Sequence, residues 1–267
     1  NAAMTLFHLS LAVVVLTLGN SGLSVPLYRT SLRFEVFMDG WNSSNKTFFD
    51  VQQTNVSNDN ITAWRVVPYY EEAAHINITI LTASFFLLSA LFHFMNAFVV
   101  RDFYLRELSH CRTPTRWIEY TFSAPVMFIL IAYSTGVRGR SEIVSTAALI
   151  AVTMFFGYWT EREGRPKDEN SWNTSFASRI LPWVLGHIPQ IVAWYVVLAQ
   201  FYDNSWDISR VPWFVHLIVW AEGALFFSFA VASFLSQWYP PRLFYRGELL
   251  FQVLSLVSKG LLGMILI

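Results

Sequence analysis

The stretch LLFQVLSLVSKGLLGMILI, residues 249–267, decides the fold, because a single lysine, Lys259, interrupts an otherwise uncharged apolar run. A helix of this length measures roughly 28 Å and crosses a bilayer core, with Lys259 near its middle. An ammonium at that depth costs about 2.5–3.5 kcal/mol, so it must be paired, neutralised or used covalently. Covalent use has a known chemistry, in which a lysine condenses with an aldehyde to a Schiff base beside a carboxylate. The alternative is a lysine that snorkels to an interface or pairs with another helix.

The composition is that of an integral membrane protein. Of the 267 residues, 54% are hydrophobic and only 13% are charged, while 17% are aromatic, more than interfacial belts need. The net charge is zero, which gives no reason to expect a nucleic-acid partner. The one cysteine, Cys111, excludes an intrachain disulfide and a thiolate metal site.

The first apolar segment, residues 4–18, has two interpretations. It is short and small residues follow it, as in a signal peptide, but it lacks a basic start, which favours a first transmembrane helix. The polar stretch 19–75 after it alternates near residues 32–38 and predicts an ordered loop or small β-hairpin. Its dense sequons indicate a surface facing the lumen or exterior in a eukaryotic secretory system. The glycosylation candidates are Asn42, Asn45, Asn55, Asn60 and, beside the next helix, Asn77.

Seven apolar segments in all predict an all-α membrane protein of seven transmembrane helices, forming a single domain over residues 1–267 with an extracellular loop at about 19–75. The segments are 4–18, 78–100, 117–136, 143–159, 180–202, 213–238 and 249–267.

Basic residues in the loops predict the orientation. The loops after helices two, four and six carry ten Arg and Lys residues, and the opposite short loops carry three. The positive-inside rule then puts the N-terminus in the cytoplasm and the C-terminus outside. The sequon-rich loop also falls outside, so two independent signals agree. A further sequon at Asn173 falls in a cytoplasmic loop and should stay unmodified.

Two other seven-helix classes fit poorly. G-protein-coupled receptors run the other way, and the last helix here has no NPxxY-like stretch. Intramembrane hydrolases need a zinc-binding cluster or a serine nucleophile in a GxSxG-like setting, and neither is present. A non-enzymatic role is therefore expected.

The carboxylate best placed to pair with Lys259 is Glu119. In the segment RWIEY, Arg116 lies three residues before it and Ser123 four after it, so the three share one helix face. This suits a counterion with a basic partner one turn toward the cytoplasm. The alternative is a snorkelling Arg116 and a shallow Glu119. For Glu119 to reach the depth of Lys259, the helix must begin around Thr113 and Pro114, with threonine as N-cap and proline in the first turn.

At several places the chain resembles the heliorhodopsins, which are retinal-binding proteins inverted relative to other microbial rhodopsins. The resemblance spans all seven helices. The heliorhodopsins include members from algal viruses. Its residues are FHL (7–9), LSALFHF (88–94), RWIEYTFSAPVMFILIA (116–132), RPKD (165–168) and RGELLFQVLSLVSKGLL (246–262).

The resemblance implies that Lys259 carries all-trans-retinal as a protonated Schiff base, with Glu119 as its counterion. It implies that Ser255 neighbours this linkage and that His8 and His93 line a polar cavity on the cytoplasmic side. It also implies a homodimer in a lipid bilayer. Independently, Ser255 lies one helical turn before Lys259 and is neutral where pumps keep a second carboxylate, so one counterion must do all the stabilising.

The chain departs from the family in two places. Gln190 stands where an aromatic residue is expected, which bears on the packing at the ring end of retinal. Glu222 lies roughly 13 Å inside the sixth predicted helix, where a carboxylate is a functional candidate. The alternative is a structural glutamate bonded to His216 or to a backbone carbonyl. Two functions follow: a light-gated passive proton conductor, in which Glu222, His8, His93 and Arg116 are path candidates, or a light sensor without transport.

Overall fold

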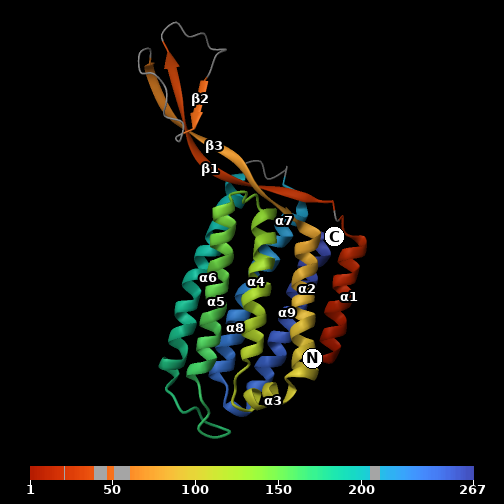
Figure 1. The fold of residues 1–267 in the computed structure, drawn as a ribbon. Helices are drawn as coiled ribbons and strands as arrows, with labels where there is room; N and C mark the ends of the chain where they lie inside the picture. The colour runs from red at the N-terminus through yellow and green to blue at the C-terminus, as the bar shows by residue number, and fades with distance from the viewer. Residues whose placement is uncertain (21, 39–46, 51–60, 205–210) are drawn as a thin grey trace.

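The computed structural model describes residues 1–20, 22–38, 47–50, 61–204 and 211–267. Long helices stand side by side as a bundle, and a β-sheet extends from one end of it (Figure 1). The N-terminus lies toward the opposite end of the bundle from the sheet, whereas the C-terminus lies near the sheet (Figure 1). The described chain therefore begins and finishes at opposite ends of the bundle.

The helices follow the hydropathy of the sequence. They are α1 (Ala2–Leu18), α2 (Ile78–Phe94), α3 (Arg101–Ser109), α4 (Pro114–Ser134), α5 (Arg140–Glu163), α6 (Phe176–Asn204), α7 (Trp213–Leu217), α8 (Gly223–Trp238) and α9 (Phe244–Leu266). A π-helical segment, Met95–Val99, continues α2, and a second, Ile218–Glu222, joins α7 to α8. A 3₁₀ turn, Pro241–Leu243, leads into α9.

Six helical stretches of the described chain are long and apolar enough to cross a membrane. They are Ile78–Val99, Pro114–Ser134, Arg140–Glu163, Phe176–Asp203, Trp213–Trp238 and Pro241–Leu266. The remaining apolar helix, α1, has 17 residues, the lower limit for a span. The structure thus supports a multi-pass membrane protein, and the seventh crossing stays a prediction.

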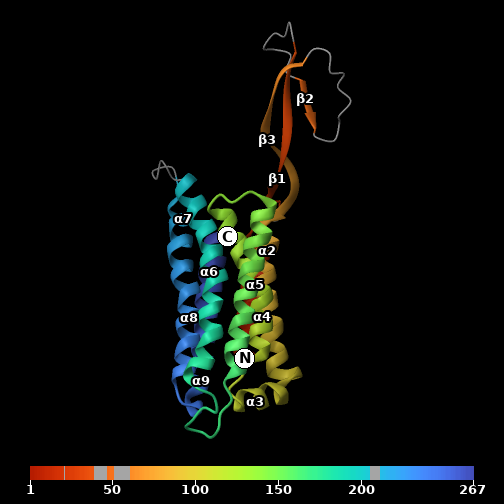
Figure 2. The ribbon, with the colours of Figure 1, turned by 90° about the vertical axis from the view of Figure 1, so that its left-hand side faces the viewer.

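The predicted hairpin exists, and its strands are longer than the sequence indicated. Strand β1 (Ser24–Met38) pairs antiparallel with β3 (Ile61–Asn77) and with the short β2 (Thr47–Asp50), in the order β2-β1-β3. The hairpin projects well beyond the helices (Figure 2). At its base the Tyr28 N–H donates to the Arg138 carbonyl at 2.9 Å, which fixes the sheet to the loop between α4 and α5.

The glycosylation candidates divide into two groups. Asn42, Asn45, Asn55 and Asn60 lie outside the described residues. Asn77 is the N-cap of α2, and its side-chain oxygen accepts a hydrogen bond from the Ile80 N–H at 2.9 Å. Glycosylation remains a prediction at all five.

Helix α4 begins at Pro114 with Thr113 at the N-cap position, as the sequence predicts. The expected capping bond is absent, because the Thr113 hydroxyl and N–H both turn to Glu161 of α5. Helix α3 was not predicted, since its stretch is polar and lacks apolar periodicity. It lies across the end of the bundle opposite the sheet and buries Tyr104 (Figure 1).

Candidate functional site

Lys259 of α9 is buried and paired. Its Nζ lies 2.7 Å from Glu119 Oε1 of α4 and 2.5 Å from Ser89 Oγ of α2. The Ser89 hydroxyl donates in turn to Glu119 Oε1 at 2.7 Å. Lys259 and Glu119 are each 3% exposed, so a salt bridge and hydrogen bonds compensate the cost of burying both charges. The helix start at Pro114 is what brings Glu119 to this depth.

Lys259 also borders a cavity between the helices. The lining comes from α4, α5, α6, α8 and α9 and is mostly apolar and aromatic, including Trp117, Trp183, Phe226, Phe229 and Phe251. Ser123, Ser255, Ser258 and Lys259 supply polar atoms to it. A mostly apolar lining with a few polar groups is typical of a site for an apolar ligand.

A glycine on α5 shapes one wall. A Cβ at Gly157 would overlap the ring of Trp117, so only glycine lets this indole lie against α5. Both residues line the cavity. Gln190, which stands where an aromatic residue is expected, also lines the cavity. Its side-chain amide donates a hydrogen bond to the Phe226 carbonyl of α8 at 3.3 Å, so this buried polar group has a partner.

Both serines predicted for the site line the cavity that Lys259 borders. Ser255 is one turn before it on α9, and Ser123 is fully buried on α4. The ring centroid of Tyr120 is 5.3 Å from Lys259 Nζ, within cation–π range. Glu119 does not line the cavity, so Lys259 stands between its carboxylate and the apolar space.

Glu222 ends the π-helical segment before α8 and is fully buried. Its Oε2 accepts a 2.6 Å hydrogen bond from Ser258, the residue before Lys259, while Oε1 has no partner among the described residues. The sequence-based alternative, in which Glu222 bonds to His216 or to a backbone carbonyl, is therefore wrong. His216 instead packs edge-on against Phe201 at 5.2 Å.

His8 of α1 and His93 of α2 lie side by side, and the polar cavity expected around them stays a prediction. Their rings stack with centroids 5.6 Å apart and planes 5° from parallel. His93 Nδ1 lies 2.9 Å from Asn1 Oδ1, while neither nitrogen of His8 has a partner in the described part of the chain. Neither ring lines the cavity beside Lys259.

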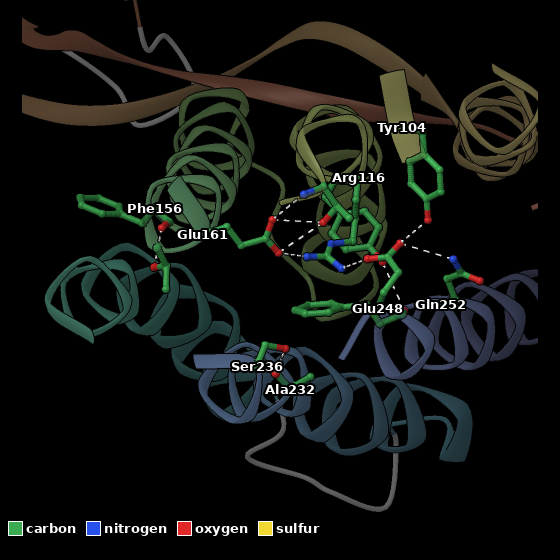
Figure 3. A network of polar contacts seen from close by, with 12 residues as sticks. Tyr104, Arg116, Phe156, Glu161, Ala232, Ser236, Glu248 and Gln252 are labelled. Atoms are coloured by element: carbon green, nitrogen blue, oxygen red, sulfur yellow. Dashed lines mark hydrogen bonds and ion pairs between the residues drawn. The ribbon is translucent and has the colours of Figure 1, made fainter. Parts of the chain in front are cut away.

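The expectation that Arg116 is the basic partner of Glu119 is also wrong. Its guanidinium forms ion pairs with Glu161 of α5 and Glu248 of α9 (Figure 3). The long side chain extends toward α5 and α9, whereas Glu119 turns to α2 and α9. Sequence reasoning missed both glutamates because it ended the fourth helix before Glu161 and began the last one after Glu248.

A helical membrane bundle with a lysine–carboxylate pair beside an apolar cavity defines a protein of the rhodopsin fold. The structure is similar to the crystal structure of thermophilic rhodopsin from Rubrobacter xylanophilus, with a TM-score of 0.50 and 17% identity over 71% of this chain and 80% of that one. This likeness concerns the fold alone.

The chain belongs to the heliorhodopsin family, whose model matches residues 1–267. None of the curated proteins compared matches the sequence. Membership of the family implies a retinal chromophore and a light-sensing role.

Proposed function

We propose that this protein is a light receptor that holds all-trans-retinal on the amine of Lys259. The observation that carries the proposal is the double position of this nitrogen, between the Glu119 carboxylate at 2.7 Å and the aromatic-lined cavity. The cavity suits an apolar aldehyde, since its lining is mostly apolar and it has one amine, that of Lys259, to react with the aldehyde group. When bound, retinal supplies visible absorption and a double bond that light isomerises.

The residues around Lys259 have separate roles in this proposal. Glu119 balances the positive charge of the lysine nitrogen, and Ser89 holds the Glu119 carboxylate by a hydrogen bond. Trp117, Phe229 and Phe251 exclude water and restrict the orientation of an apolar ligand. Movement of a ligand bound to Lys259 would shift this nitrogen away from Glu119. The ion pair would then weaken, and the nitrogen would hold its proton less tightly.

We further propose that illumination opens a passive proton conductance. Support comes from Glu222, whose carboxylate reaches Ser258 immediately beside Lys259. A buried carboxylate in a membrane helix, whose one hydrogen bond to a described residue comes from a serine, is a functional candidate by default. The stacked His8 and His93 pair offers titratable groups on α1 and α2, and Arg116 stays a path candidate through its two glutamates.

The second candidate function is a light sensor without transport. The observation that favours it is that the titratable groups do not form a continuous hydrogen-bonded path, since His8 makes no hydrogen bond to a described residue. Ser255 also stands where a second carboxylate on α9 would be needed for pumping. We infer for either function a cytoplasmic N-terminus, an exterior hairpin and a homodimer, and size-exclusion chromatography with light scattering checks the last of these.

Photocurrent against membrane voltage, in cells expressing the chain with added retinal, separates the functions. A passive path gives currents that reverse near the proton equilibrium potential, and Glu222→Gln abolishes them while the visible band stays. Glu142→Gln, an exposed position at the start of α5, is the matched control and should leave the currents unchanged. Currents of one direction at all voltages would indicate a pump, and no current at any pH gradient would leave the sensor.

A further inference from the structure

Arg116 lies in a buried cluster that takes no part in holding retinal. Its two terminal nitrogens each meet a different carboxylate, Nη2 that of Glu161 and Nη1 that of Glu248 (Figure 3). Arg116, Glu161 and Glu248 are 5%, 3% and 7% exposed. The guanidinium also lies 3.9 Å from the ring centroid of Phe251, which closes the cluster on one side. Three helices therefore bring three ionisable groups together away from solvent.

The cluster contains one cation and two carboxylates. No second Lys or Arg forms an ion pair with either glutamate among the described residues. If both carboxylates were ionised, the cluster would carry one uncompensated negative charge in a low-dielectric interior. Burial of an uncompensated charge is costly, and groups in that position take up a proton instead.

The surrounding titratable groups do not supply the missing positive charge. Burial, and then Glu248, raise the pKa of the Tyr104 phenol on α3, and burial raises the pKa of the Cys111 thiol to about 11, with Glu161 adding to it. Both groups are therefore neutral near neutral pH. Tyr120 of α4 and His93 of α2 also lie within electrostatic range of Glu248. Neither has a hydrogen bond to the two glutamates.

The two carboxyls differ in the donors they receive. Glu161 accepts the Thr113 N–H at 2.9 Å and the Thr113 hydroxyl at 3.1 Å, and the Trp117 indole faces it. Glu248 is approached by the Tyr104 hydroxyl at 3.1 Å and, at 3.4 Å, by the Gln252 amide. Donors to the charged form stabilise a carboxylate, and Glu161 has the stronger set, including a backbone N–H.

We propose that Glu161 and Glu248 share one exchangeable proton in the dark, so that this cluster is a buried proton-binding site. One proton from the medium bonds to a carboxylate oxygen, mainly of Glu248, and the net charge of the cluster changes from −1 to zero. The proton belongs to the pair, because loss or neutralisation of one carboxyl leaves the other as the sole partner of Arg116. The site ties α3, α4, α5 and α9 together at the end of the bundle opposite the sheet (Figure 1). It depends neither on retinal nor on proton conduction.

Infrared spectroscopy of the full-length protein tests the proposal through the C=O stretch of protonated carboxylic acids. Labelling with ¹³C-glutamate identifies the glutamate bands by their shift. The spectrum at neutral pH should contain a protonated-glutamate band that disappears completely in Glu161→Gln and also in Glu248→Gln. Either substitution suffices, because the remaining carboxyl then pairs alone with Arg116 and ionises. Arg116→Lys keeps the cation and should keep the band.

Glu222→Gln is the matched control, because Glu222 does not touch the cluster. It should remove at most a separate band and leave the shared one. A band lost in only one of the two cluster variants would mean an isolated protonated glutamate and would overturn the proposal. If the cluster variants fail to fold, Glu222→Gln still decides, since a folded Glu222→Gln protein without any protonated-glutamate band overturns it as well.

Discussion

Replacing Glu119 by glutamine removes one charge from the site and changes little else. The glutamine oxygen still accepts from Ser89 and Lys259, so the substitution isolates the electrostatic contribution. Two unit charges 2.7 Å apart attract by about 6 kcal/mol at an effective dielectric constant of ~20, before the cost of desolvating them is subtracted. Breaking a buried pair from one side typically costs about 3–5 kcal/mol, unless the remaining group gives up its charge.

The expected loss is large enough to measure by melting. For a protein of this size each kcal/mol shifts the melting temperature by about 2–4 °C, so Glu119→Gln should melt roughly 10 °C below the parent without retinal. The double variant Glu119→Gln, Lys259→Met removes both charges and should recover most of this loss. With retinal added, the visible band of Glu119→Gln should move to the red, or to the near ultraviolet once the nitrogen loses its proton.

Glu142→Gln is the control for the general effect of a Glu-to-Gln change, and it should melt and absorb like the parent. The reasoning is refuted if Glu119→Gln melts with the parent and keeps an unchanged band at every pH. A double variant that is as unstable as Glu119→Gln would also contradict it, since the loss would then not come from an unpaired Lys259.

Three further predictions concern parts outside the membrane spans. Glycans should appear on the loop between the first two helices and not at Asn173, and glycosidase treatment with mass mapping checks this; an occupied Asn173 would reverse the orientation. Burial raises the pKa of the Cys111 thiol to about 11, so alkylating reagents should label it at neutral pH only after denaturation, and rapid labelling of folded protein would contradict its burial. Hydrogen bonds from Ser171 and Asn170 lower the pKa of the Asp168 carboxyl. These bonds therefore stabilise the loop fully at pH values above the ordinary pKa of aspartate, and the stabilisation is lost as the pH falls through the lowered pKa. Hydrogen exchange at both amides should follow that loss, and pH-independent protection at acid pH would count against it.

The long helices were predictable because membrane spans need many consecutive apolar residues, and this signal is strong in a single sequence. The start of α4 at Pro114 was predictable from the Thr-Pro pair. The polar helix α3 was not, because no apolar period marks it and Tyr104 is its one buried residue. The strand lengths were underestimated, since alternation is clear only over part of β1.

The pairing of Lys259 with Glu119 followed from their isolation among apolar residues, which leaves few possible partners. The partners of Arg116 did not follow, because a long side chain reaches neighbouring helices whose rotation and ends hydropathy does not define. Glu161 and Glu248 lie within a helical turn or two of the predicted ends of their segments, where charged residues are normally solvated. Likewise, the choice of Ser258 over His216 as the partner of Glu222 depends on how α8 packs on α9.

Mass mapping after borohydride reduction of the protein loaded with retinal identifies the lysine that carries the chromophore. The sequence has three lysines, Lys46, Lys167 and Lys259, and the reduced adduct should be found on Lys259 alone. Lys259→Ala should lose both the adduct and the visible band. An adduct on Lys46 or Lys167, or a visible band that survives Lys259→Ala, would contradict the attachment of retinal to Lys259.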